Sequence, residues 1–108
     1  MTESEIQKAV FEHLRTRGAP KAVFWHVPND KSSRRKAGYR AGVHDVHVVH
    51  GGKFFSLELK TDKGQVQVEQ LSFRDRIHDA GGYSHIAYGL SEALTWLEAC
   101  GVIRKEAA

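Results

Sequence analysis

The sequence predicts a single α/β domain over residues 1–108, in which helices flank a mixed β-sheet. Three observations lead to this fold class. A length of 108 residues suits one compact domain. Apolar residues recur with a helical period in some segments and alternate as in strands in others. These segments follow the order helix, strand, β-hairpin, helix, strand, helix, or α-β-β-β-α-β-α.

Helices are expected over residues 2–17 and 66–80, and from about 91 to 99. In the first, Thr2 and Glu5 have the spacing of a capping box, which satisfies backbone amides at a helix start. Gly18 and the pair Gly81-Gly82 are expected to end the first and second helices. Ser91 is expected to cap the third helix.

Strands are expected over residues 22–27, 45–50, 53–60 and 83–88. The middle two flank Gly51-Gly52, and such a two-residue glycine connection is typical of a β-hairpin. Residues 29–44 are polar, basic and glycine-containing, so we expect a long loop there. Long loops in compact domains often carry function.

The composition excludes a membrane-spanning helix and favours a reducing compartment. No apolar run approaches the roughly 20 residues that a membrane helix needs. Cys100 is the single cysteine, so an internal disulfide is impossible. We therefore expect a cytoplasmic protein.

A basic cluster stands out within a modest net charge of +3. Its members lie within ten positions that contain no acid, and they are Lys31, Arg34, Arg35, Lys36 and Arg40. Such a cluster suits contact with nucleic-acid phosphates. A solvated basic loop is the alternative interpretation.

The hairpin places two acids opposite each other. If Gly51 and Gly52 form the turn, paired positions sum to 103, and Asp45 then faces Glu58. Lys60 lies two residues beyond Glu58, on the same face of the strand. Like charges in opposed positions destabilise a sheet unless something compensates them.

A divalent cation between the two carboxylates would provide that compensation. Oxygen ligands favour Mg²⁺ or Mn²⁺, and such an ion activates water and polarises phosphoryl oxygens. Lys60 is then placed to orient the water or to stabilise developing charge. The alternative is a pair of edge-strand acids in solvent with Lys60 as a surface partner.

Glu3 and Gln70 are weaker candidates for the same site. Glu3 falls in the same helical sector as Ile6 and Val10, which makes it a candidate additional metal ligand. Gln70 shares a stripe with Phe73, so its amide is expected to point inward and to be hydrogen-bonded. Alternatively, Glu3 frays into water at the helix start and Gln70 lies at the rim of the interface.

With these residues placed, the chain resembles the VRR-NUC family of the PD-(D/E)XK nuclease superfamily, from about Glu3 to Leu97. The ordered motifs that carry the resemblance are Glu3 with Ile6-Gln7, His26-Val27-Pro28-Asn29, Gly42-Val43-His44-Asp45, Glu58-Leu59-Lys60, and Gly64 with Gln70.

The resemblance implies a restriction-endonuclease-like fold and a metal-dependent phosphodiesterase acting on DNA. Asp45, Glu58, the Leu59 carbonyl and Glu3 would hold Mg²⁺ or Mn²⁺, and Lys60 would be the catalytic lysine. Gln70 matches the glutamine of the motif. The family's pattern commonly has proline before the catalytic aspartate, and His44 in this chain puts the loop geometry in doubt.

The resemblance also suggests a substrate and an assembly. Compact members of the family look like homodimeric Holliday-junction resolvases, so cleavage of branched DNA in repair by a bacterial or phage-encoded homodimer is expected. The residues expected to contact the DNA are Arg34, Arg35, Lys36, Arg40, His26 and Asn29.

Three other interpretations have less support. Zinc is disfavoured because His44, His47 and His50 alternate faces along a strand. A non-catalytic nucleic-acid-binding module would use the basic cluster, but it gains nothing from an inward acid pair. A partner subunit of a replication or repair assembly is the third.

Overall fold

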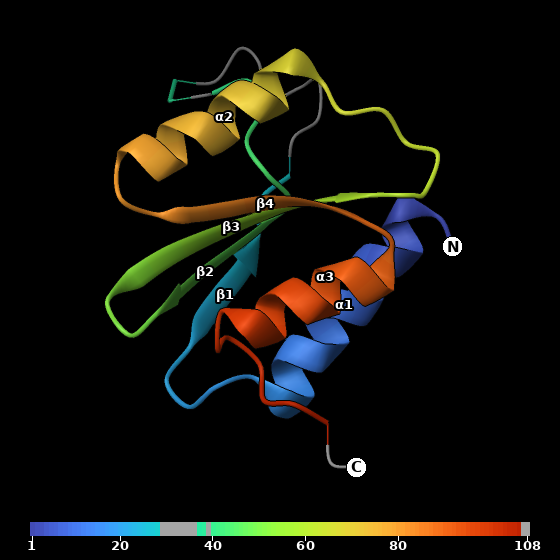
Figure 1. Cartoon of the computed structure of the whole chain (residues 1–108), viewed down its shortest axis with the longest axis vertical. Helices are drawn as coiled ribbons and strands as arrows, with labels where there is room; N and C mark the ends of the chain where they lie inside the picture. Colours follow the sequence, from blue (N-terminus) through green and yellow to red (C-terminus); the bar gives the residue numbers. More distant parts are fainter. Residues whose placement is uncertain (29–36, 39, 107–108) are drawn as a thin grey trace.

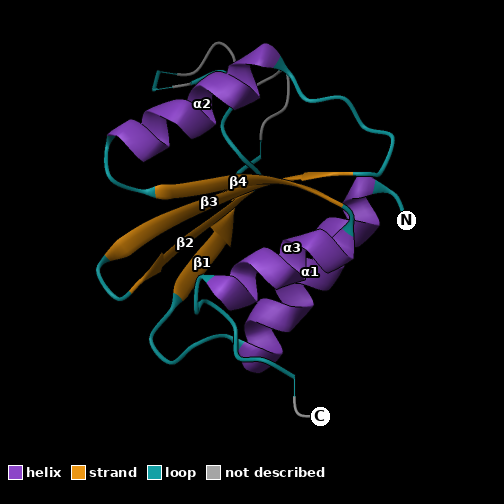
Figure 2. Ribbon diagram, in the orientation of Figure 1, coloured by secondary structure: helices purple, strands orange, loops and turns teal. Residues whose placement is uncertain are grey.

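A computed structural model describes residues 1–28, 37–38 and 40–106 of the chain. It contains a four-stranded sheet with α1 and α3 on one face and α2 on the other (Figures 1 and 2). The elements are α1 (Glu3–Arg17), β1 (Val23–His26), β2 (Val46–His50), β3 (Lys53–Lys60), α2 (Val68–Asp79), β4 (Tyr83–Tyr88) and α3 (Leu90–Ala99). The predicted fold class and order of elements are confirmed.

The sheet is mixed, with the order β1-β2-β3-β4. The first three strands are antiparallel, and β4 pairs with β3 in parallel after the chain crosses over through α2. Gly51 and Gly52 close the β2–β3 hairpin with φ values of 60° and 75°. Both values lie in the left-handed region that glycine adopts at little cost, so the predicted two-residue turn is confirmed.

The start of α1 follows the predicted capping box. The Thr2 hydroxyl accepts from the Glu5 amide at 3.1 Å, and the Glu5 carboxylate accepts from the Thr2 amide at 2.8 Å. The helix ends at Gly18, whose φ of −61° is open to any residue. Glycine is required there for space, because a Cβ would lie 2.3 Å from the Leu14 carbonyl oxygen.

Two predicted helix starts were wrong. The second helix begins at Val68 rather than at 66, because Gln67 is its N-cap and forms a capping box with Gln70. The third begins at Leu90, with Gly89 as N-cap and no side-chain cap, so Ser91 lies inside the helix. The turn from β4 needs a φ of 91° at residue 89, which favours glycine over a capping serine.

The two faces of the sheet differ in chemistry. Facing α1 and α3 is an apolar core, to which β2 and β3 contribute Val46, Val48, Phe55, Leu57 and Leu59. On the face toward α2, β3 instead carries Ser56, Glu58 and Lys60, all of them buried. The apolar face supplies the stability, at about 1.5–3 kcal/mol for each fully buried large aliphatic side chain. Because this core stabilises the fold, the opposite face can accommodate the cost of burying polar groups.

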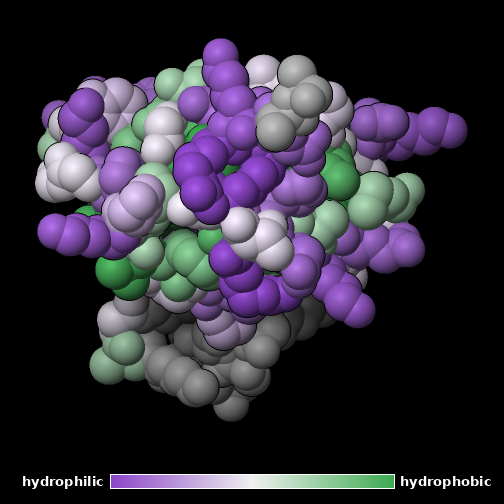
Figure 3. Space-filling view, turned by 90° about the horizontal axis from the view of Figure 1, so that it is seen from below, coloured by the Kyte–Doolittle hydropathy of each residue, from purple (hydrophilic) through white to green (hydrophobic). Residues whose placement is uncertain are grey.

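The surface seen from below Figure 1 is mainly hydrophilic, with smaller hydrophobic patches between the polar side chains (Figure 3). Arg17 joins the end of α1 to α3 through an ion pair with Glu98 at 2.8 Å. Among the described residues, no helix is both long enough and apolar enough to cross a membrane.

Candidate active site

Asp45 and Glu58 occupy the opposed positions that the hairpin predicts. The observed pairs run from His50–Lys53 to Val46–Leu57, and each sums to 103. Asp45 directly precedes β2, so the next position in this register sets it opposite Glu58, and the two carboxyl groups are close enough to hydrogen-bond. On its other side, the Asp45 carbonyl accepts from the Val27 amide at 2.9 Å, which extends the pairing of β2 with β1. The Asp45 carboxylate accepts from the Leu59 amide at 3.0 Å. This bond ties the aspartate side chain to the strand that carries Glu58.

Glu58 is held in a nearly closed environment, with 3% of its surface exposed. Its Oε2 accepts from the Gln70 amide at 2.9 Å and lies 3.6 Å from the Lys60 ammonium. No N–H or O–H donor in the described part of the chain reaches its buried Oε1, and the Asp45 carboxyl is close enough to share a proton with Glu58. A buried carboxylate oxygen with no donor is costly, and a bound cation would satisfy it.

Burial and charge proximity shift the acidity of the pair. Burial and, after it, the neighbouring Asp45 charge raise the pKa of Glu58 to about 8, against the opposing effect of Lys60. Burial also raises the pKa of Asp45, while the hydrogen bond from Leu59 lowers it. Two carboxyl groups this close share a proton near neutral pH, and a divalent cation is the natural replacement for that proton.

The Glu58 shift predicts how metal-free stability depends on pH. The unfolded chain releases this proton near pH 4.5, whereas the folded protein holds it to about pH 8. Stability is therefore lost as pH rises between these values, because the unfolded state gains from ionisation that folding prevents. Thermal unfolding in EDTA from pH 4.5 to 9 should show wild type losing stability relative to Glu58→Gln. Parallel pH profiles for the two proteins would contradict the assignment.

Gln70 is the predicted inward-pointing amide, and the structure places it on Glu58. Gln70 lies in the first turn of α2, where its Oε1 accepts from the Gln67 amide at 2.9 Å. This leaves its Nε2 to donate to Glu58. The side chain is thus fixed at both ends, and α2 is anchored on the acid.

His44 is the residue whose role the sequence did not reveal. It is fully buried between the sheet and α2, and hydrogen-bonds the Gln70 carbonyl, Ser56 and Ser84. Burial lowers the pKa of His44 to about 4. These hydrogen bonds fix the segment just before β2 to the sheet and to α2. The only sequence signal of this role was a histidine at a place where the family pattern has proline.

Glu3 and His26 lie at the margin of the site formed by the two carboxylates. Glu3 is the first residue of α1 and is exposed, yet its charge is near enough to raise the pKa of Glu58. His26 is also exposed, with its Nδ1 3.1 Å from the Asp45 carbonyl oxygen. Metal ligation by Glu3 and by the Leu59 carbonyl stays a prediction.

The described residues contain no group of three His, Cys, Asp or Glu side chains arranged to hold a metal ion. Asp45 and Glu58 would therefore need further oxygen ligands from backbone, water or phosphate. Mg²⁺ commonly binds in this way, through one or two carboxylates and several waters. The donor set and the unpartnered Glu58 oxygen both fit such an ion.

Comparison with known proteins bears on the fold. No protein-family model matches the sequence, and no curated protein matches it. Among solved structures, a chain described as "VRR_NUC domain protein" superposes on 91% of this chain and 86% of its own length, with a TM-score of 0.75. This chain shares the fold of that protein. At 20% sequence identity this likeness establishes architecture, and the predicted resemblance is confirmed at that level.

The predicted nucleic-acid contacts lie only partly within the described residues. Asn29, Arg34, Arg35 and Lys36 lie outside the described residues. Arg40 lines a hollow of about 370 Å³ beside the start of α2, together with Arg76 and Glu69. Arg76 was missed by the sequence analysis, because a single arginine on a helix gives no signal until the fold brings it near Arg40.

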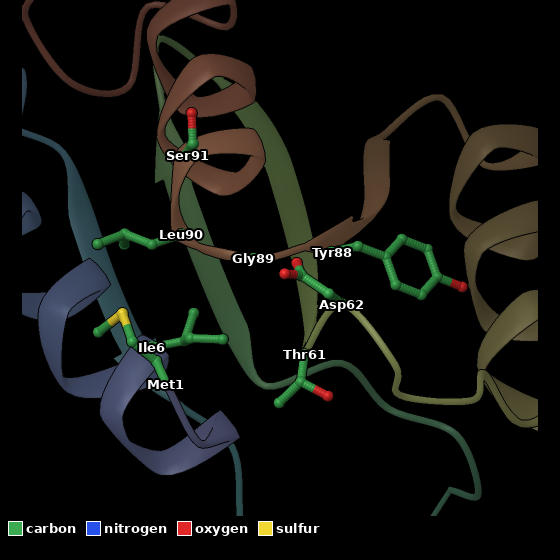
Figure 4. A pocket seen from close by; sticks show the side chains of 8 residues that line it. All are labelled: Met1, Ile6, Thr61, Asp62, Tyr88, Gly89, Leu90 and Ser91. Atoms are coloured by element: carbon green, nitrogen blue, oxygen red, sulfur yellow. The ribbon is translucent and has the colours of Figure 1, made fainter.

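A second hollow, of about 280 Å³, lies where β3 and β4 end and α1 and α3 begin (Figure 4). Met1, Ile6 and Leu90 lie on its α1 side, whereas Tyr88 points toward α2. The hydrogen bond from the Gly89 amide to the Lys60 carbonyl, at 2.8 Å, joins its wall to the end of β3. Asp45 and Glu58 do not line this hollow, so we assign it no part in the candidate site.

Proposed function

We propose that this chain is a Mg²⁺- or Mn²⁺-dependent endonuclease that hydrolyses DNA phosphodiester bonds. The observation that carries the proposal is the buried Glu58, with one oxygen unpartnered, between Asp45 and Lys60. An acid in this position destabilises the metal-free fold, and cation binding supplies a reason for keeping it. The VRR_NUC fold is consistent with this activity.

Each residue has a distinct part in the proposed reaction. Asp45 and Glu58 would hold the ion, together with the Leu59 carbonyl and water, and Glu3 would have to move from its exposed position to become a further ligand. The bound ion would polarise a phosphoryl oxygen and lower the pKa of a water. Lys60 would orient the attacking water and stabilise the charge that develops on the phosphate. Gln70 keeps Glu58 in place by donating to its Oε2.

The DNA backbone would approach the side of α2 that Arg40 lies against. Arg40 and Arg76 line one hollow there, and two guanidinium groups suit bidentate contact with phosphates. Further DNA contacts are proposed for His26, Asn29, Arg34, Arg35 and Lys36. We propose a cytoplasmic location. The DNA of the expected bacterial host is in the cytoplasm, and the free thiol of Cys100 is compatible with a reducing compartment.

The activity is tested by cleavage of a panel of labelled DNAs. Four-way junction, flap, nicked and linear duplex substrates should be incubated with Mg²⁺, Mn²⁺ or EDTA. We expect cleavage only with metal, and fastest on branched DNA, as for a junction resolvase acting in repair. Lys60→Met is the control for contaminating nuclease, because it should remove cleavage without removing the metal ligands.

The alternatives give different results in the same experiment. A non-catalytic nucleic-acid-binding module would bind these DNAs with steep salt dependence and would cleave none of them. A partner subunit of a replication or repair assembly would neither cleave nor bind tightly alone. Metal-dependent cleavage of linear duplex at the same rate as the junction would retain the nuclease and remove the preference for branched DNA.

We further propose a homodimer, since paired cleavage of a junction requires two sites on one substrate. The supporting feature is an apolar patch on β1 and β2, where Val23, Trp25 and Val49 are 58%, 40% and 40% exposed. Val23 and Trp25 belong to β1, which is an edge strand of the described sheet, and Val49 pairs with Val23 from β2. Light scattering of the wild type should give twice the mass of one chain. The Trp25→Glu variant should give the mass of a single chain. A monomeric wild type would exclude the dimer and leave the nuclease proposal intact.

A further inference from the structure

His44 has all its polar atoms engaged in the interior. Its Nε2 lies 3.0 Å from the Gln70 carbonyl oxygen, and its Nδ1 lies 3.1 Å from Ser56 Oγ and 3.2 Å from Ser84 Oγ. The two serine hydroxyls are 2.6 Å apart. The ring also packs edge-on against Phe73, with centroids 4.8 Å apart. These contacts connect the start of β2 with β3, β4 and α2.

The partners determine where the ring proton lies. A carbonyl oxygen only accepts, so His44 Nε2 carries the proton and donates to Gln70. Nδ1 then accepts from one serine hydroxyl, and the other serine donates to its neighbour. Every buried donor and acceptor of the imidazole is satisfied by one neutral tautomer. A buried network that is completely satisfied fixes a single arrangement of the elements it joins.

The bond to Gln70 matters because of what the Gln70 side chain does. The Gln70 backbone carbonyl accepts from His44, and the Gln70 side-chain amide donates to Glu58 Oε2 at 2.9 Å. The next residue after His44 is Asp45, whose carboxylate is bound to the Leu59 amide. His44 therefore links the backbone of the aspartate to the helix turn that steadies the glutamate.

We infer that His44 is a positioning residue, which holds the first turn of α2 so that the Gln70 amide stays on Glu58. Proline at this position would have no side-chain hydrogen-bonding group, and could not make either bond. The inferred effect on cleavage rests on the proposed nuclease function, whereas the effect on Gln70 does not. Groups that orient a metal ligand typically change metal affinity or activity about 10–100-fold when removed.

The test compares two substitutions of His44 with a matched helix variant. His44→Gln keeps an amide that can donate to the Gln70 carbonyl, whereas His44→Phe keeps a ring of similar size without hydrogen bonds. Phe73→Leu disturbs packing at the same place and leaves the bonds of His44 intact. The Gln70 side-chain amide is followed by proton–nitrogen NMR, and kcat and KM for junction cleavage are measured with saturating Mn²⁺.

We expect His44→Phe to shift the Gln70 side-chain amide resonances toward those of free glutamine and to lower kcat at least about tenfold. KM for DNA should change little. His44→Gln should recover most of both properties, and Phe73→Leu should lose stability without the change in kcat. If His44→Phe does not fold, the double variant Ser56→Ala, Ser84→Ala removes the donors to Nδ1 and should shift the same resonances.

Two results would overturn the inference. One is a Gln70 amide unchanged in His44→Phe or in the double serine variant. The other is an equal fall of kcat in Phe73→Leu at equal loss of stability, which would make His44 a packing residue only. A wild type that cleaves no DNA would contradict the proposed function, and the NMR comparison would still decide the placement of Gln70.

Discussion

Asp45→Asn, Glu58→Gln and Lys60→Met should each lower DNA cleavage at least about 100-fold while the protein stays folded. The first two remove a negative charge from the proposed metal site, and the third removes the cation 3.6 Å from Glu58. Folding should survive because the apolar core lies on the opposite face of the sheet. Single-turnover cleavage with Mn²⁺ and circular dichroism provide the two measurements.

Stability and activity should change in opposite directions for one of these variants. Glu58→Gln removes a buried acid whose pKa is raised to about 8, so above that pH it should unfold at a higher temperature than metal-free wild type. Asp79→Asn, at an exposed position at the end of α2, is a matched control and should leave cleavage and the pH dependence of stability unchanged. Normal cleavage by any of the three site variants would refute the site assignment.

Gly42→Ala should be the most destabilising single-methyl change near the site. A Cβ at this position would lie 2.1 Å from the Glu69 carbonyl oxygen and 2.8 Å from the Gln70 amide nitrogen. The residue also has a φ of 81°, where any side chain adds about 1–2 kcal/mol of strain. Together these effects should lower the free energy of unfolding by more than about 2 kcal/mol in urea denaturation.

Gly42→Ala should also impair cleavage. The segment that it displaces leads into β2 and contains His44 and Asp45. Gly51→Ala is the matched control, since φ at Gly51 is 60° and a Cβ there meets no atom within 4 Å. Gly51→Ala should lower the free energy of unfolding only by the cost of backbone strain, and it should retain cleavage activity. If both glycine variants lose equal stability, close packing of this loop on α2 is not what holds the site together.

Local patterns in the sequence were sufficient to predict much of the site. The Gly51-Gly52 turn determines the hairpin register, so the facing of Asp45 and Glu58 followed from counting residues. Gln70 was predicted to point inward because it shares a helical stripe with Phe73, and both are buried. The boundaries of the helices near Gln67 and Gly89 were missed, since these caps depend on turns that join strands to helices.

Contacts between distant segments were beyond sequence reasoning. The anchoring of His44 requires Ser56, Ser84 and the Gln70 carbonyl to meet, and these come from three separate elements. The unpartnered Glu58 oxygen is likewise a property of packing, since the sequence shows only an acid on a strand. Arg76 became a candidate only when α2 was placed beside Arg40.

Direct Mn²⁺ binding tests the central claim that Asp45 and Glu58 hold the catalytic ion. Electron paramagnetic resonance reports free Mn²⁺ as the protein is titrated to millimolar metal at pH 7.5. Wild type should bind Mn²⁺ at one site, Asp45→Asn and Glu58→Gln should bind it at least about tenfold more weakly, and Lys60→Met should bind it as well as wild type. Wild-type affinity in both carboxylate variants would contradict the account.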